Sequence, residues 1–255
     1  MSIHVPTGLK CMSVYNIGMN FTHIMFAVLA GILPSLLWLW FWLREDNLNP
    51  EPRSVVARAF IAGMTAMILV LPFQLAVEQY INITAQKYVL WAFIEEVMKL
   101  LVVYIVAWRT RDLDEPIDDI IYIITGALGF AALENTFYIL NIISKGDIFN
   151  SIVTANMRFI GSTLVHVVCS ACIGYMAART FYMNNILRAF WITIGVVLAT
   201  AFHSFFNLNI LSGDIVSKMK IFAYVWVCVV VILLLFERIK LLKPRTSQNT
   251  EGLSN

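Results

Sequence analysis

Three ionisable side chains lie within one apolar stretch of this chain. Glu95, Glu96 and Lys99 fall inside the run 88–108, which is long enough to cross a bilayer, because about 20 helical residues span the hydrocarbon layer. An ionisable side chain at that depth costs roughly 3 kcal/mol even on a lenient scale, so such residues indicate a functional site. A carboxylate placed there can act as a general base, which takes a proton from water and makes it a nucleophile.

Later apolar stretches carry further polar side chains. They are Glu134 and Asn135, then Arg158 and His166, and finally His203 and Asn207. The acidic and histidine residues lie about 7 to 11 residues from the same end of their expected helices, roughly 10–16 Å deep at 1.5 Å per residue. Because these helices alternate in direction, the shared depth predicts one polar pocket, built by four helices in the outer half of the membrane.

Helical spacing indicates which of these groups share a face. Glu95 and Lys99 are four residues apart, so we expect them to form an ion pair. His203 and Asn207 have the same spacing, which lets an imidazole and an amide point at one spot. Glu96 lies about 100° further round its helix than Glu95. Glu95 is therefore the preferred base, although the sequence does not decide between the two glutamates.

Other interpretations fit the same residues. A buried His or Asn often makes only a hydrogen bond between helices, and buried Glu and His also carry protons or ions through transporters. Two glutamates and two histidines could ligate a divalent ion. The chain lacks a His-Glu-x-x-His sequence, so zinc is compatible but unsupported, and we expect no metal or other cofactor.

The composition is that of a membrane protein. Hydrophobic residues make up 60% of the 255 residues and charged residues 13%, whereas soluble domains are about half apolar and about a quarter charged. The net charge of +2 is too small to indicate a nucleic-acid partner, and the lipid bilayer is the expected environment. Cys169 and Cys172 have CxxC spacing, but within an apolar helix they are better interpreted as small core residues.

Membrane-spanning helices must position these groups. The hydropathy pattern predicts an all-α, polytopic transmembrane bundle of about seven spans, forming a single domain over residues 21–236. An N-terminal tail of residues 1–20 precedes it, and a basic, disordered C-terminal tail of residues 237–255 follows. The expected spans are 21–43, 55–77, 88–108, 117–143, 155–182, 186–211 and 219–236.

Lysine and arginine residues are unevenly divided between the two sides of this topology. With the C-terminal tail inside, about ten of them lie on the inner side and about five on the outer side. Because positive residues favour the cytoplasmic side of a membrane, we expect the N-terminus outside and the C-terminus in the cytoplasm.

The order and spacing of these motifs resemble a known family. Residues 95–99 (Glu-Glu-Val-Met-Lys) resemble the EExxK motif of the PrsW family of glutamic-type intramembrane proteases, and residues 129–135 resemble its GFAxxEN motif. His166 resembles the third motif and residues 203–207 the HxxxN motif, while residues 49–53 (Asn-Pro-Glu-Pro-Arg) are similar to the family's first loop. The resemblance covers roughly residues 34–209. The related CAAX-protease and bacteriocin-processing (CPBP) enzymes often have an arginine one position after Lys99, which this chain lacks.

The resemblance implies a reaction. Glu95 and His166 would activate a water molecule, and His203 and Asn207 would stabilise the oxyanion at the scissile carbonyl. The catalytic residues that it implies are Glu95, Glu96, Glu134, His166, His203 and Asn207. The supporting residues are Lys99, Asn135 and Arg158. The implied substrate is a single-span membrane protein, such as an anti-sigma factor, cut at site 1 in its extracytoplasmic part, and the implied location is the bacterial cell (inner) membrane.

We therefore predict a membrane-embedded glutamic-type peptidase that acts by intramembrane proteolysis. A proton- or ion-coupled transporter and a non-catalytic scaffold of the same fold are the alternatives. A transporter would spread its ionisable groups along a path through the bilayer, whereas these groups share one depth. A scaffold would have lost some of the water-activating or oxyanion groups, and all are present.

Overall fold

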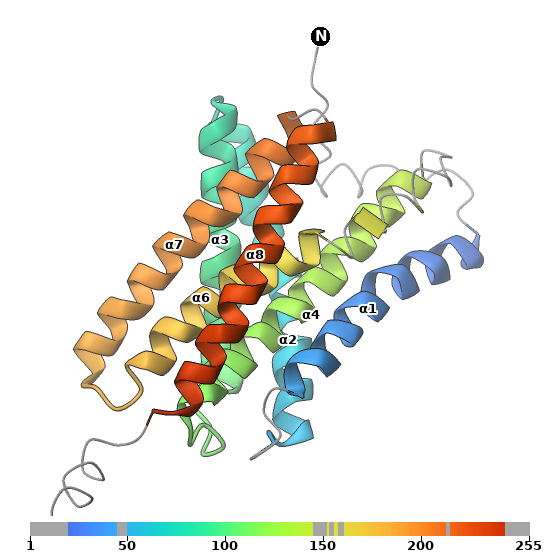
Figure 1. Cartoon of the computed structure of the whole chain (residues 1–255). Coiled ribbons are helices and arrows are strands. Elements are labelled where there is room, and N and C mark those ends of the chain that lie inside the picture. Colours follow the sequence, from blue (N-terminus) through green and yellow to red (C-terminus); the bar gives the residue numbers. More distant parts are fainter. Residues whose placement is uncertain are drawn as a thin grey trace, which may run out of the picture.

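The regular elements of the protein are helical. The computed structural model describes residues 20–44, 50–144, 152, 156–157, 161–212 and 215–242, and within these ranges there is no strand. The helices pack as a bundle (Figure 1), which confirms the predicted fold class. They are α1 (Phe21–Leu43), α2 (Arg53–Tyr80), α3 (Thr84–Val106), α4 (Pro116–Ile143), α6 (Thr163–Arg179), α7 (Asn185–Ser212) and α8 (Ile215–Lys240).

Most of these helices have the length and composition of a membrane span. Within the described ranges, α1, α2, α4, α7 and α8 are long and apolar enough to cross a bilayer, so the chain is an integral membrane protein. The 17-residue α6 is apolar but shorter, and α3 carries the charged groups of the first motif. The expected span at 155–182 is described as continuous α-helix only over α6.

The helix α4 lies at the centre of the bundle. Its most apolar window is 94% buried inside the protein, whereas that of α1 is 17% buried and therefore faces lipid. α1, α2 and α6 all pack against α4 (Figure 1). Pro116 stands in its first turn, and the Asp118 carboxylate accepts hydrogen bonds from the Asp114 and Glu115 backbone N–H groups, which caps the helix.

Glycines allow α2 and α4 to approach closely. A Cβ atom added to Gly129 would meet the carbonyl oxygen of Phe60, and one added to Gly63 would meet the carbonyl of Gly126. Small residues of this kind let helix backbones pack tightly in membranes. Gly129 of the GFAxxEN motif is therefore a packing residue, and the contact fixes the position of Glu134 further along α4.

A second buried polar cluster lies near the start of α4, where it joins the loops at that end of the bundle. Arg188 of α7 donates to both carboxylate oxygens of Asp119, at 2.7 and 2.9 Å. The Tyr122 hydroxyl donates to Glu51 and contacts the Asp112 carbonyl oxygen at 3.3 Å. Because Tyr122 is twelve residues before Glu134, Glu51 of the first loop lies roughly 18 Å along α4 from the other motifs.

Candidate active site

Glu96 is the best-connected carboxylate of the site. Its Oε1 atom accepts hydrogen bonds from Lys99 Nζ at 2.6 Å and from His203 Nδ1 at 2.8 Å. Glu96 and Lys99 are both fully buried. Lys99 thus pairs with Glu96, and the ion pair expected with Glu95 is not formed, because the i,i+3 neighbour shares its face too and Glu95 is held by another helix.

His203 links the two glutamates across α3 and α7. Because the paired Glu96 carboxylate can only accept, the His203 Nδ1 atom carries a proton. In the neutral ring this leaves a lone pair on Nε2, and that atom faces the Oε2 atom of Glu95 at 3.7 Å. His203 is therefore oriented by one glutamate and presents its acceptor nitrogen to the other.

His166 on α6 is oriented in a similar way by α3 and α4. The Lys99 ammonium lies 3.1 Å from His166 Nδ1 and has only donors, so Nδ1 accepts. The proton of the neutral ring then sits on Nε2, which lies 3.0 Å from Glu134 Oε2. The His166 and His203 rings meet edge to face, with centroids 5.0 Å apart. Phe130 packs against both Lys99 and His166.

Glu95 is held by a residue that the motifs did not reveal. Gln74 of α2 donates from Nε2 to Glu95 Oε1 at 2.8 Å, and Trp91 Nε1 donates to the Gln74 carbonyl at 3.2 Å. The other oxygen, Glu95 Oε2, is buried and has no hydrogen-bond partner among the described residues. The only signal for Gln74 in the sequence is an isolated amide in an apolar span, two residues after Pro72.

The remaining motif residues differ in their access to the cluster. The Glu134 side chain is 26% exposed, against 2% for His166, so it lies at the edge of the site. Asn135 donates to Thr163 Oγ1 at 3.0 Å and ties α4 to α6. Asn207 is half-buried, one turn beyond His203 on α7. Arg158 lies outside the described residues.

Three of these groups could hold a divalent metal ion once the Lys99 ammonium moves away from His166 Nδ1. Glu95, His166 and His203 each offer one ligand atom, and these atoms lie within 4.8 Å of one another. Two imidazole nitrogens and a carboxylate oxygen form a donor set of catalytic zinc sites, in which a fourth position stays open for water. The unpartnered oxygen of Glu95 is the ligand that this set requires.

Comparison with known proteins places the chain in a family. The model of the PrsW-protease family, described as PrsW family intramembrane metalloprotease, matches residues 51–235. The chain belongs to the PrsW family. The match includes every residue of the cluster from Gln74 to Asn207 and confirms the resemblance read from the motifs.

Curated relatives support the same assignment. Protease PrsW of Geobacillus kaustophilus (strain HTA426) is 28% identical over 72% of this chain and 80% of that protein. Protease PrsW of Bacillus subtilis (strain 168) is 24% identical over 79% of this chain and 92% of that protein. Protease PrsW of Halalkalibacterium halodurans is 27% identical over 73% and 85%, respectively. No solved structure gives a significant match.

Proposed function

We propose that this PrsW family member is an endopeptidase that hydrolyses a peptide bond of a single-span membrane protein. The observation that carries the proposal is the pair formed by Glu95 Oε2 and His203 Nε2, which face each other at 3.7 Å, both residues being almost fully buried. A water molecule that reaches this pair meets two proton acceptors and little competing solvent. This is the environment in which a general base acts on water.

The proposed reaction assigns the steps to named atoms. Glu95 takes one proton from water, and the water oxygen attacks the scissile carbonyl carbon to give a tetrahedral oxyanion. The proton held by Glu95 then passes to the leaving nitrogen as the C–N bond breaks. Gln74 holds the spectator oxygen of Glu95 at 2.8 Å, so the free oxygen stays aimed at the water.

The hydrogen bonds refine the role of each histidine. We expected His203 and Asn207 to donate to the oxyanion, but the bond to Glu96 leaves His203 Nε2 as an acceptor. His203 therefore assists Glu95 on the water side. The Asn207 amide is the donor proposed for the oxyanion, where one such donor contributes about 3 kcal/mol to transition-state stabilisation. The Nε2–H group of His166 stays bonded to Glu134, so His166 holds Lys99 and Glu134 in place beside the site.

A metal-dependent version of the same hydrolysis is the second candidate. The convergence of Glu95, His166 and His203 favours it, as does the description of the matched family as metalloproteases. These three residues would hold the ion, which supplies an activated water and polarises the substrate carbonyl. Glu96 and Glu134 would then orient the two histidine rings.

The proposed setting follows from the distribution of charge. With the N-terminus outside and the C-terminus in the cytoplasm of a bacterial inner membrane, the site lies in the outer half of the bilayer. An extracytoplasmic cut in a single-span protein, such as an anti-sigma factor, matches that depth. The lipid bilayer and this substrate are the proposed partners, and no nucleic acid is involved.

The test is cleavage of a tagged single-span anti-sigma factor by the purified protein in liposomes. We expect Glu95→Gln to reduce the cleavage rate about a hundredfold or more, while Asp119→Asn, a matched change in the second buried cluster, keeps it. Cleavage by Glu95→Gln at the parent rate would refute the proposal. A chelator that leaves the rate unchanged supports the glutamic type, whereas a loss that zinc restores assigns the metal-dependent version.

A further inference from the structure

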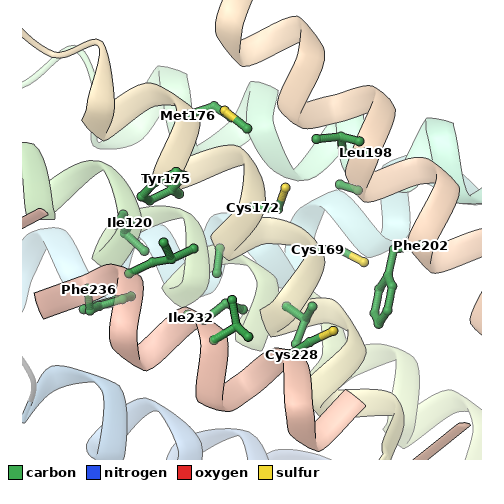
Figure 2. Close-up of a pocket in the computed structure, with 15 residues that line it drawn as sticks. Ile120, Cys169, Cys172, Tyr175, Met176, Leu198, Phe202, Cys228, Ile232 and Phe236 are labelled. Carbon is green, nitrogen blue, oxygen red and sulfur yellow. The ribbon is translucent and has the colours of Figure 1, made fainter. Parts of the chain in front are cut away.

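An apolar cavity of about 410 Å³ lies between α6, α7 and α8. Figure 2 shows it in close-up, with side chains of these three helices and Ile120 of α4 around it. Its lining consists of carbon and sulfur atoms apart from the Tyr175 hydroxyl group and the backbone. Its volume falls within the range of about 300–1,000 Å³ that is typical of ligand pockets.

One end of the cavity lies next to the proposed catalytic cluster. Cys169 lines the cavity, and its Sγ atom lies within 4.8 Å of ligand atoms of Glu96 and His203. Phe202, which precedes His203 on α7, also lines it. Whatever occupies this end of the cavity is therefore within reach of the groups that act on the substrate.

The cavity extends from the cluster in one direction only along these helices. On α6 the lining runs from Cys169 through Cys172 to Met176, seven residues or roughly 10 Å towards the turn between α6 and α7. On α7 it runs from Phe202 back to Leu198, which is the same direction because the two helices are antiparallel. The cavity thus lies on the side of the cluster that faces the α6–α7 turn.

The cavity also reaches the lipid-facing surface of the bundle. Leu198 of α7 and Val231 of α8 both line it, and each is 47% exposed on the outside of the protein. An occupant can therefore arrive sideways from the bilayer, between α7 and α8. A polar ligand would find few hydrogen-bond partners along this lining, because the Tyr175 hydroxyl is its one side-chain oxygen.

We propose that this cavity binds apolar side chains of the substrate's membrane segment, on the α6–α7 side of the scissile bond. The inference rests on the proposed peptidase activity and adds a specificity rule to it. Large aliphatic residues next to the cut on that side favour cleavage, because their burial contributes about 25 cal/mol per Å² of apolar surface. Serine residues at the same positions lower it.

Photocrosslinking from Cys172 tests the occupant directly. In a variant with Cys11→Ser and Cys228→Ser, the partly exposed Cys172 is labelled with a benzophenone maleimide and the protein is placed in phosphatidylcholine liposomes. The probe is a biotinylated single-span peptide with a poly-leucine membrane segment joined to an extended Gly-Ser stretch. A second peptide has serines in place of the four leucines beside that stretch. We expect the crosslinking yield of the leucine peptide to be at least fivefold higher than that of the serine peptide.

The matched control carries the label on the lipid-facing side of α3. Leu101→Cys, with Cys172→Ser in the same background, places the benzophenone at a position that is 47% exposed in the native protein. Equal peptide yields from the two positions, or products with phosphatidylcholine alone at Cys172, would overturn the proposal and assign the cavity to a lipid chain.

A second arm separates the cavity from the catalytic chemistry. The crosslinking is repeated with Glu95→Gln, and we expect the peptide preference to persist without cleavage. If the parent protein cleaves but shows no crosslinking preference for the leucine peptide, the cavity proposal alone is refuted. If Glu95→Gln still cleaves, the peptidase mechanism alone is refuted. Ala199→Leu, which fills the cavity, is expected to raise KM at least fivefold for the leucine peptide sequence and to leave kcat unchanged.

Discussion

Two buried polar clusters of this protein look alike by composition and differ in how their hydrogen bonds are used. Each sets a fully buried carboxylate against a cation, Glu96 against Lys99 and Asp119 against Arg188. In the cluster near the start of α4, Arg188 donates to both oxygens of Asp119, and the arrangement is complete in itself. The pair joins α4 to α7.

The cluster of the candidate active site leaves acceptors unused. The Oε2 atoms of Glu95 and Glu96 are buried and have no hydrogen-bond partner among the described residues. Two imidazole rings stand beside them, each fixed on one side by a charged group. An unsatisfied buried acceptor lowers stability. The two free oxygens stand beside oriented histidines, whereas both oxygens of Asp119 are bonded.

The largest difference in kcat is expected between the variants Glu96→Gln and Asp119→Asn. The amide at position 96 can present its N–H₂ to His203, which removes the partner that fixes the ring's tautomer, and we expect kcat to fall about 10³-fold. Asp119→Asn should leave kcat unchanged and lower the free energy of unfolding by about 3 kcal/mol. Cleavage rates and thermal unfolding in detergent measure the two effects, and a catalytic loss in Asp119→Asn would break the comparison.

Removing the two cations sharpens the same distinction. Lys99→Met leaves Glu96 without its cation and His166 without the donor at Nδ1, so we expect both a loss of about 3 kcal/mol in stability and a fall of about 10²-fold in kcat. Arg188→Met should show the stability loss alone. The measurement is kcat per folded molecule, with folding followed by gel filtration, and equal kcat losses in both variants contradict the assignment.

A smaller effect is expected from Gln74→Ala. The change removes the donor to Glu95 Oε1 but no atom that touches substrate, so we expect kcat to fall about tenfold, or about 1.4 kcal/mol, with KM unchanged. Thr65→Ala serves as control, because Thr65 lies on the same helix and its hydroxyl donates to the Ile61 carbonyl oxygen one turn earlier. If Gln74→Ala cleaves at the same rate as the control, Gln74 has no role in positioning Glu95.

The smallest effect is expected from Tyr122→Phe in the structural cluster. It deletes the hydroxyl that donates to Glu51, and we expect about 1–2 kcal/mol of lost stability with no change in kcat. Thermal unfolding and the cleavage assay measure it together. A fall in kcat would show that the loop carrying Glu51 affects the distant site as well as the stability of the fold.

The sequence predicts the helices well, because lipid leaves the backbone no hydrogen-bond partners and forces each apolar run into a helix. It also predicts that Glu95, Glu134, His166 and His203 converge, since ionisable groups in a membrane must find one another. The sequence does not predict which of these groups bond to each other. Spacing allows Lys99 to bond Glu95 or Glu96, and only the approach of α2, which brings Gln74 to Glu95, decides between them.

Long-range packing also sets the features that the sequence missed. Gln74 and the cavity between α6, α7 and α8 depend on how neighbouring helices cross, and no local pattern encodes those crossings. The resemblance of residues 49–53 to a family loop gave no indication of distance. The structure places Glu51 beside Tyr122 at the other end of α4.

The distribution of the cluster over five helices bears on how the protein is made. The ribosome delivers α2, α3 and α4 first, with Gln74, Glu95 and Glu134, while His203 arrives only with α7. Until α7 enters the membrane, Glu96 lacks its imidazole partner and the cluster has no second proton acceptor. The proposed active site is therefore complete only once α7 has entered the membrane, near the end of insertion of the protein.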